Sequence, residues 1–211
     1  MAQEERRLAA IVQADVVGYS RLIGLDGEGT RARLRTHRSE WIDPKITEHG
    51  GRIVKTMGDG LLLEFPSVVN ATRCAIDIQS GMTHRNAGLD EDQSIRYRIG
   101  INLGDVVVDG DDIYGDGVNV AARLEALAEP GSIYLSRAAH DQVQDRLDVP
   151  LEGLGEIEVK NIARPVQVFR ITLESEAKPR IAKGESRYHR YGIAVVIAIM
   201  VAYYSYNIWY G

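Results

Sequence analysis

Cysteine is nearly absent from this sequence, and so is any excess of positive charge. Among 211 residues there is one cysteine, Cys74, which cannot form a disulfide within its own chain. Such scarcity is typical of proteins in a reducing compartment, and we expect Cys74 to be a core side chain on an apolar helix face. The formal net charge of −5 offers no basic field, so we expect no nucleic-acid partner.

Long apolar runs are also scarce, with one exception near the C-terminal end. The first ten residues, MAQEERRLAA, contain no stretch long enough for a signal peptide, so we expect that the globular part is not exported. Residues 191–211 carry no charged side chain, and a helix of that length spans about 30 Å, the thickness of a bilayer's hydrocarbon core. We therefore predict a transmembrane helix at 191–211. The alternative is a hydrophobic helix buried against the domain.

Basic and aromatic residues flank this stretch unevenly. Basic residues precede it and none follow, which by the positive-inside rule places the preceding part of the chain in the cytoplasm. They are Lys178, Arg180, Lys183, Arg187 and Arg190. The other end is rich in tyrosine and tryptophan, as at membrane interfaces. We expect a single-pass protein of the cell membrane, with a cytoplasmic domain at 1–172 and a basic linker at 173–190.

The pattern of apolar residues in the domain indicates a mixture of helices and strands. Residues 8–17 form a nearly continuous apolar run, typical of a strand buried on both faces, whereas residues 95–103 alternate and predict a half-buried strand. Helices are predicted at 30–49, 67–85, 117–128 and 137–144, and further strands at 52–57, 61–65, 132–136, 156–159 and 166–171. The order β-α-β-β-α-β predicts an α+β fold, a ferredoxin-like sandwich with additional strands and helices.

Two segments place an aspartate beside a glycine turn. Asp15 ends the first buried strand, and the turn at Gly18 opens a helix whose N–H groups can face phosphate oxygens. Asp59 lies at the tip of a hairpin, between two glycines. If the two aspartates lie on adjacent strands, they could share two Mg²⁺ ions with substrate phosphates. Each aspartate alone is also explained as an ordinary turn residue.

A third segment, 112–125, contains a helix that begins near Gly117. Asn119 and Arg123 are four residues apart on this helix, so both project from one face, while Val120 and Leu124 occupy another face and pack inward. A solvated polar face would produce the same pattern.

Together the three segments resemble the class III nucleotidyl cyclase catalytic domain, the adenylate and guanylate cyclase family, in its bacterial form. The resemblance covers residues 8–171. It rests on the Asp–Gly turn, on Lys-Thr-x-Gly-Asp-Gly at the hairpin and on Gly-x-x-Val-Asn-x-Ala-x-Arg on the helix. It implies an adenylate cyclase for intracellular signalling, in which the ribose 3′-hydroxyl of ATP attacks the α-phosphate to give 3′,5′-cyclic AMP and pyrophosphate.

The resemblance also implies how metal ions and phosphates are bound. Asp15 and Asp59, with the backbone of Val16, would hold two Mg²⁺ or Mn²⁺ ions. The phosphates would lie against the backbone of Val17, Gly18, Tyr19 and Ser20.

Three further residues receive roles from the same resemblance. Asn119 would position the ribose, and Arg123 would stabilise the charge that builds on the α-phosphate. Lys160 resembles a late lysine that contacts the polyphosphate, although the family usually has glycine where this chain has Asn161.

The resemblance also implies that Lys55 and Asp112 select the base. Adenine presents an acceptor at N1 and a donor at its amino group, which a lysine and an aspartate complement, so the sequence favours ATP over GTP. Asp111 lies beside Asp112, which leaves a one-residue slip open. A guanylate or relaxed-specificity cyclase is the second interpretation, and a non-catalytic dimerisation or signalling module is the third.

In this family, active sites lie between two catalytic domains. One domain supplies the metal-binding aspartates, and the other supplies the groups that recognise the base and stabilise the transition state. Because this chain contains both sets, we expect a head-to-tail homodimer with two equivalent sites.

Overall fold

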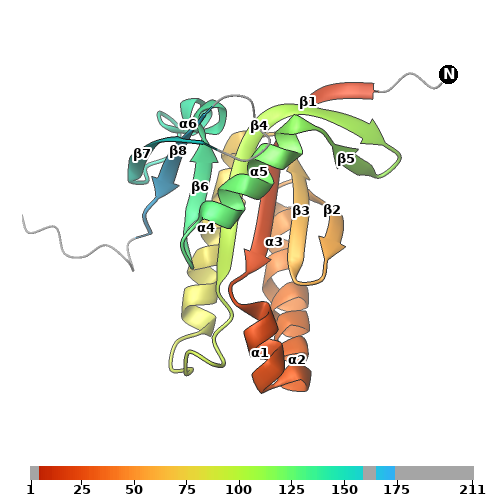
Figure 1. Cartoon of the computed structure of the whole chain (residues 1–211), viewed down its shortest axis with the longest axis vertical. Helices are drawn as coiled ribbons and strands as arrows, with labels where there is room; N and C mark the ends of the chain where they lie inside the picture. Colours follow the sequence, from red (N-terminus) through yellow and green to blue (C-terminus); the bar gives the residue numbers. More distant parts are fainter. Residues whose placement is uncertain (1–4, 159–164, 174–211) are drawn as a thin grey trace, which may run out of the picture. The chain divides into compact units, whose positions relative to one another are not determined.

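An eight-stranded sheet is the centre of the domain (Figure 1). The structure is a computed structural model that describes residues 5–158 and 165–173. The strands are β1 (Glu5–Val16), β2 (Arg52–Met57), β3 (Gly60–Phe65), β4 (Tyr97–Asp109), β5 (Asp112–Tyr114), β6 (Ile133–Ser136), β7 (Leu151–Ile157) and β8 (Val166–Ile171). Their order is β2-β3-β1-β4-β6-β8-β7, and β5 pairs with β4.

The chain builds the first half of this sheet in the predicted β-α-β-β-α-β order. The helices are α1 (Tyr19–Leu25), α2 (Gly27–His37), the π-helix η1 (Arg38–Ile42), α3 (Asp43–Glu48), α4 (Val68–Arg85), α5 (Asp116–Leu127) and α6 (Arg137–Val143). β1 lies between β3 and β4 and pairs antiparallel with both, and β2 pairs antiparallel with β3. The predicted α+β fold is therefore confirmed.

Helices cover both faces of the sheet. In Figure 1, α5 crosses the near side of the sheet and α4 lies behind it. Ala10, Val12 and Ala14 of β1 belong to the larger core with α4, while Ala9 and Ile11 belong to a smaller core with α5. Side chains alternate along a strand, so a strand covered on both sides needs apolar residues at successive positions. This confirms the double burial predicted for the first strand, except that Leu8 is exposed.

The strand predicted at 95–103 is confirmed for most of its length, but the prediction that it is half-buried was wrong. The strand begins at Tyr97, and residues 99–102 are buried on both faces. A Cβ at Gly100 would collide with the backbone of α5 at Ala121 and Glu125, so the absence of a side chain there lets the helix lie directly on the strand. Asn102 Nδ2 donates to the carbonyl of Gly117 at 2.9 Å, so this buried amide is hydrogen-bonded to the helix that covers it.

The helix predicted at 30–49 begins earlier and is not regular throughout. Asp26 caps α2 by accepting from the N–H of Gly29 at 2.9 Å, and the helical stretch then continues through η1 into α3. Pro44 has no N–H to donate to the preceding turn, which accounts for the irregular π segment before it. The predicted helix at 67–85 is confirmed, and Ser67 caps it. The strand predicted at 156–159 begins earlier, as β7.

The C-terminal predictions fall largely outside the part of the chain that the structure describes. Except for Leu173, the predicted linker at 173–190 and the predicted span at 191–211 lie beyond it. Within residues 5–158 and 165–173, no helix has both the length and the apolar character that a membrane span requires. Cys74, on α4, is buried as predicted, and burial raises the pKa of its thiol to about 12.

Candidate active site

Two aspartates from different elements meet at one edge of β1. Asp15 is the penultimate residue of this strand, and Asp59 lies in the turn between β2 and β3. Because β3 is paired with β1, the turn is brought beside Asp15. Burial, a hydrogen bond with Asp15 and the negative charge of Asp15 raise the pKa of Asp59 to about 6, and the N–H of Val16 also donates to Asp59. Two crowded carboxylates that share a proton are a chemically suitable ligand pair for a divalent cation.

Arg98 and Glu125 complete this group, and the sequence analysis assigned neither. Arg98 is the direct cross-strand neighbour of Asp15 in the β1–β4 register. Its Nη2 atom lies 3.1 Å from Asp15 Oδ2 and 3.0 Å from Glu125 Oε1, with Glu125 reaching the sheet from α5. Burial raises the pKa of Glu125 to about 7, although the charge of Arg98 opposes this shift. One feature of the sequence pointed toward Arg98. The alternation of residues 95–103 places it on the same strand face as Gly100 and Asn102.

Lys55 and Asp112, which the family resemblance assigned to the base, contact each other. Lys55 Nζ lies 2.6 Å from Asp112 Oδ2, and the N–H of Ile113 donates to the other carboxylate oxygen at 2.7 Å. The hydrogen bond from Lys55 lowers the pKa of Asp112. Of the two neighbouring aspartates, Asp112 makes the contact with Lys55, while Asp111 presents its backbone carbonyl to Arg52 Nη1 at 2.8 Å.

A β-bulge orients Lys55 toward this partner. The pairing of β2 with β3 shifts between Ile53 and Lys55, so that Arg52 pairs with Glu64 and Lys55 with Leu62. Without the shift, two residues three positions apart would point to opposite faces of the sheet. With it, Arg52 and Lys55 share a face, which is also the face of the buried Glu64 carboxylate that pairs with Arg52 at 2.7 Å.

Asn119 and Arg123 point away from the acidic pair of their own chain. Both are exposed on α5, and within residues 5–158 and 165–173 neither side chain has a hydrogen-bond or ion-pair partner. Arg123 precedes the sheet-facing Glu125 by two positions, which on an α-helix is a rotation of about 200°. The structure therefore does not bring Asn119 and Arg123 to Asp15 and Asp59 within one chain.

The turn after β1 has the backbone shape that the sequence suggested. Gly18 adopts a left-handed conformation with φ of 64° and precedes the first residue of α1. The N–H of Val17 donates to the carbonyl of Arg96 at 2.8 Å and is therefore engaged within the chain. The first turn of a helix leaves its N–H groups without helical acceptors, so Tyr19 and Ser20 keep the geometry for an anion. Lys160 lies outside the described residues.

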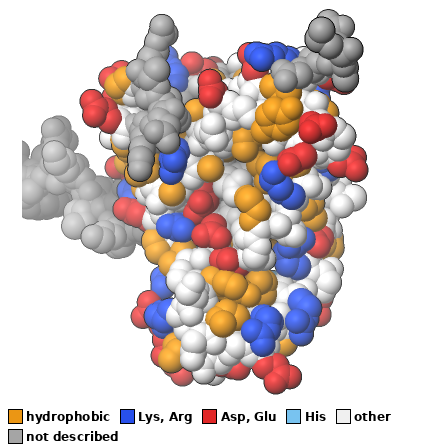
Figure 2. Space-filling view, turned by 45° about the vertical axis from the view of Figure 1, so that its right-hand side comes forward, with side chains coloured by type: hydrophobic (Ala, Val, Ile, Leu, Met, Phe, Trp, Pro, Cys, Tyr) orange, Lys and Arg blue, Asp and Glu red, His pale blue; other side chains and the backbone are white. Residues whose placement is uncertain are grey.

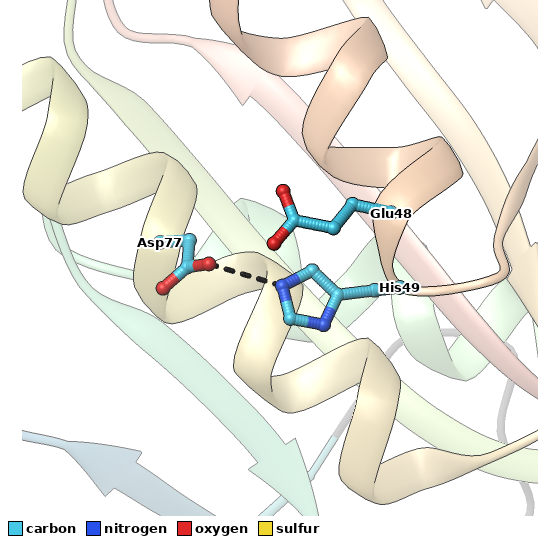
Figure 3. A group of neighbouring side chains, drawn as sticks. All are labelled: Glu48, His49 and Asp77. Carbon is cyan, nitrogen blue, oxygen red and sulfur yellow. Dashed lines mark hydrogen bonds and ion pairs between the residues drawn. The ribbon is translucent and has the colours of Figure 1, made fainter.

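A second acidic group lies on the other face of the sheet. Glu48 and His49 at the end of α3 face Asp77 of α4, with ligand atoms within 4.8 Å of one another (Figure 3). His49 Nε2 lies 3.0 Å from Asp77 Oδ2. Lys45 Nζ already lies 2.8 Å from Glu48 and 3.4 Å from Asp77, so its positive charge takes the place that a cation would have. We assign this group to an ion-pair network that joins α3 to α4.

Known proteins resemble this chain over most of its length. The family model described as the adenylate and guanylate cyclase catalytic domain matches residues 1–172. The Rhizobium meliloti (strain 1021) protein named “Putative adenylate cyclase 3” is 46% identical over 186 residues. That match covers 86% of this chain and 32% of the relative, so the chain spans about a third of that protein's length.

Solved structures show the same fold. The adenylate/guanylate cyclase/hydrolase from Silicibacter pomeroyi has 48% sequence identity and a TM-score of 0.74, over 81% of this chain and 99% of that one. The adenylyl cyclase CyaB from P. aeruginosa has 26% identity and a TM-score of 0.71, over 81% and 96% of the two chains. The chain therefore belongs to the class III adenylate and guanylate cyclase family.

Proposed function

We propose that this protein is an adenylate cyclase that converts ATP to 3′,5′-cyclic AMP and pyrophosphate. The observation that carries the proposal is the meeting of Asp15 and Asp59 at one site, where burial and mutual repulsion leave a carboxylate pair in need of a proton or a cation. These two residues, with the backbone of Val16, would hold two Mg²⁺ or Mn²⁺ ions. When bound there, the ions acidify the ribose 3′-hydroxyl and neutralise the triphosphate.

Arg123 and Asn119 support an active site shared between two chains. Both face solvent on the side of α5 opposite to Glu125, so they are placed to contact a nucleotide held by the aspartates of a neighbouring copy. Asn119 would orient the ribose, and Arg123 would stabilise negative charge on the α-phosphate.

Exposed hydrophobic side chains are consistent with such pairing. Figure 2 shows several hydrophobic patches between the charged residues of one face. Among the large exposed hydrophobic residues of the described part of the chain are Met57 of β2, Tyr114 of β5 and Leu127 of α5. In a homodimer interface the apolar surface of such side chains would be buried away from water, which favours association.

The Lys55–Asp112 pair supports ATP rather than GTP as the substrate. The ammonium group has three donors and the carboxylate has two acceptor oxygens, so each can contact a base while the 2.6 Å bond between them persists. Adenine offers an acceptor and a donor side by side, which matches this pair. Guanine has a donor where adenine has an acceptor, and an acceptor where adenine has a donor. Guanine would therefore place its donor against Lys55 and its acceptor against Asp112.

We extend the proposal to a membrane tether at 191–211, with the domain on the cytoplasmic side. The uncharged stretch and the basic residues before it support this location. Confinement to a plane raises the effective concentration of the chains and so favours dimers.

Product formation by paired variants tests the proposal. The purified chain is incubated with ATP or GTP and Mn²⁺, and cyclic nucleotide is measured by chromatography. We expect cyclic AMP from the unmodified chain and none from Asp15→Ala. Co-expressed Asp59→Ala and Arg123→Ala chains should recover about a quarter of the activity, since half of random dimers are mixed and each mixed dimer has one intact site of two. An inactive unmodified chain would refute the catalytic proposal, and an absence of recovery would refute the shared site.

A further inference from the structure

The two oxygens of the Asp15 carboxylate have different neighbours, and Arg98 contacts one of them. The cross-strand register places Arg98 beside Asp15, and its Nη2 atom donates to Oδ2 at 3.1 Å. The other oxygen, Oδ1, lies toward Gly60, the residue that follows Asp59. One oxygen is thus held by β4, and the other remains available on the side of β1 where Asp59 lies.

Glu125 is placed beside Arg98 by the contact of α5 with β4. Gly100 allows the backbone of α5 at Glu125 to lie directly on the strand, two residues after Arg98 and on the same face. The Glu125 side chain is 11% exposed, and Arg98 Nη2 lies 3.0 Å from its Oε1 atom. A buried carboxylate is costly without a compensating charge, and Arg98 provides that charge.

The balance of charge around Asp15 explains why a third acid is present. An arginine that contacts a metal-binding aspartate repels divalent cations, because both carry positive charge within a few ångströms. Glu125 offsets this repulsion, so that Arg98 can orient the aspartate without lowering the net negative charge that Asp15 and Asp59 present.

We propose that Arg98 and Glu125 are a positioning pair for Asp15, in which Arg98 fixes the carboxylate and Glu125 neutralises Arg98 so that divalent cations still bind. The inference rests on the proposed function, because it takes Asp15 as a metal ligand. It assigns Glu125 a role beyond that of an ion pair that fastens α5 to the sheet. Residues that orient metal ligands typically change metal affinity by about 10- to 100-fold when they are removed.

The test measures Mn²⁺ binding without catalysis. The probe is Mn²⁺ with 3′-deoxy-ATP, which lacks the attacking hydroxyl, and free Mn²⁺ is quantified by electron paramagnetic resonance. We expect Glu125→Gln to raise the dissociation constant for Mn²⁺ by about tenfold or more. The control is Glu152→Gln, which removes the same charge from another arginine-paired glutamate on β7, at the far edge of the sheet, and should bind as the unmodified chain does.

A double variant separates charge balance from simple fastening. Arg98→Gln with Glu125→Gln removes one charge of each sign, so it should bind Mn²⁺ more tightly than Glu125→Gln alone. This variant also carries the test if Glu125→Gln does not fold. Equal Mn²⁺ binding by Glu125→Gln and Glu152→Gln, or a double variant that binds no better than Asp15→Ala, would overturn the inference. An unmodified chain that binds no Mn²⁺ with the probe would instead refute the proposed function.

Discussion

Replacement of Asp59 by asparagine should stabilise the metal-free protein at neutral pH. Asp59 is held against Asp15 in a partly buried site, and its pKa is raised from the ordinary 3.8 to about 6. A carboxyl group with a raised pKa favours the folded state while it is protonated and loses that contribution as pH rises through the folded-state value. At pH 7.5 the group is ionised in both states, so the partial burial of its charge and the repulsion from Asp15 both oppose folding.

The size of the effect follows from the pKa values. A rise from 3.8 to about 6 corresponds to about 3 kcal/mol at a pH above both values. Partial exposure to solvent weakens the interaction, so we expect the free energy of unfolding of Asp59→Asn to exceed that of the unmodified chain by about 1–2 kcal/mol. Between pH 4 and pH 6, the unmodified chain should lose stability relative to the variant as pH rises.

Urea denaturation in EDTA and in Mn²⁺ measures this difference. In EDTA at pH 7.5 the variant should be the more stable protein, and the advantage should shrink or reverse in Mn²⁺, which stabilises the folded state only where it binds. Asp145→Asn, a change at an exposed aspartate, is the control and should shift neither curve. A variant that is less stable than the unmodified chain in EDTA would contradict the unfavourable charge of Asp59. A variant that gains as much stability from Mn²⁺ would show that Asp59 does not bind the cation.

Two other substitutions test the close contact of α5 with β4 and the base-recognition pair. Gly100→Ala introduces a Cβ into the backbone of α5 and should lower the free energy of unfolding by about 1–3 kcal/mol in urea denaturation. Gly24→Ala adds the same group where no atom lies within 4 Å and should be neutral or stabilising, so equal losses would contradict the packing argument. Lys55→Glu replaces an ion pair with Asp112 by a repulsion and should reduce kcat/KM for ATP by at least about tenfold, while kcat/KM for GTP falls less. Arg73→Glu, a charge reversal on an exposed helix position, is its control, and equal ATP/GTP ratios in both variants would remove Lys55 from base selection.

The residues that carry local motifs could be placed from the sequence. The sequence predicted that Asp15 and Asp59 could meet if their strands are adjacent, and the pairing of β1 with β3 meets that condition. The family resemblance assigned Lys55 and Asp112 to the same base, but it did not predict their direct contact, which depends on a bulge and on the β4–β5 hairpin. A register shift leaves little trace in a single sequence, since it changes the pairing of residues rather than their types.

Arg98 and Glu125 could not be predicted because their role depends on a contact between distant segments. Alternating polar and apolar residues normally indicate that one face of a strand is exposed to water. This interpretation is wrong for β4, because the backbone of α5 covers that face at two glycines. Gly100 and Gly104 on β4 are the features that permit this cover, and glycine by itself is an ambiguous signal in a strand. Glu125 lies two residues after Arg123 of the motif. That its side chain points toward Arg98 can be known only once α5 has been placed on β4.

Because Gly100 and Gly104 let the backbone of α5 approach β4 closely, we expect the helix to move as one body with the strand in the dimer we propose. Its inner surface brings Glu125 to the proposed cation site of its own chain, while its outer surface would present Arg123 to the nucleotide of the other chain. If the nucleotide held by the other chain displaces the helix, Glu125 should move with it. The close packing of the α5 backbone on β4 leaves little space for the two to shift independently. Occupancy of one catalytic centre would then alter cation affinity in the other, and ATP saturation curves would depart from simple hyperbolae.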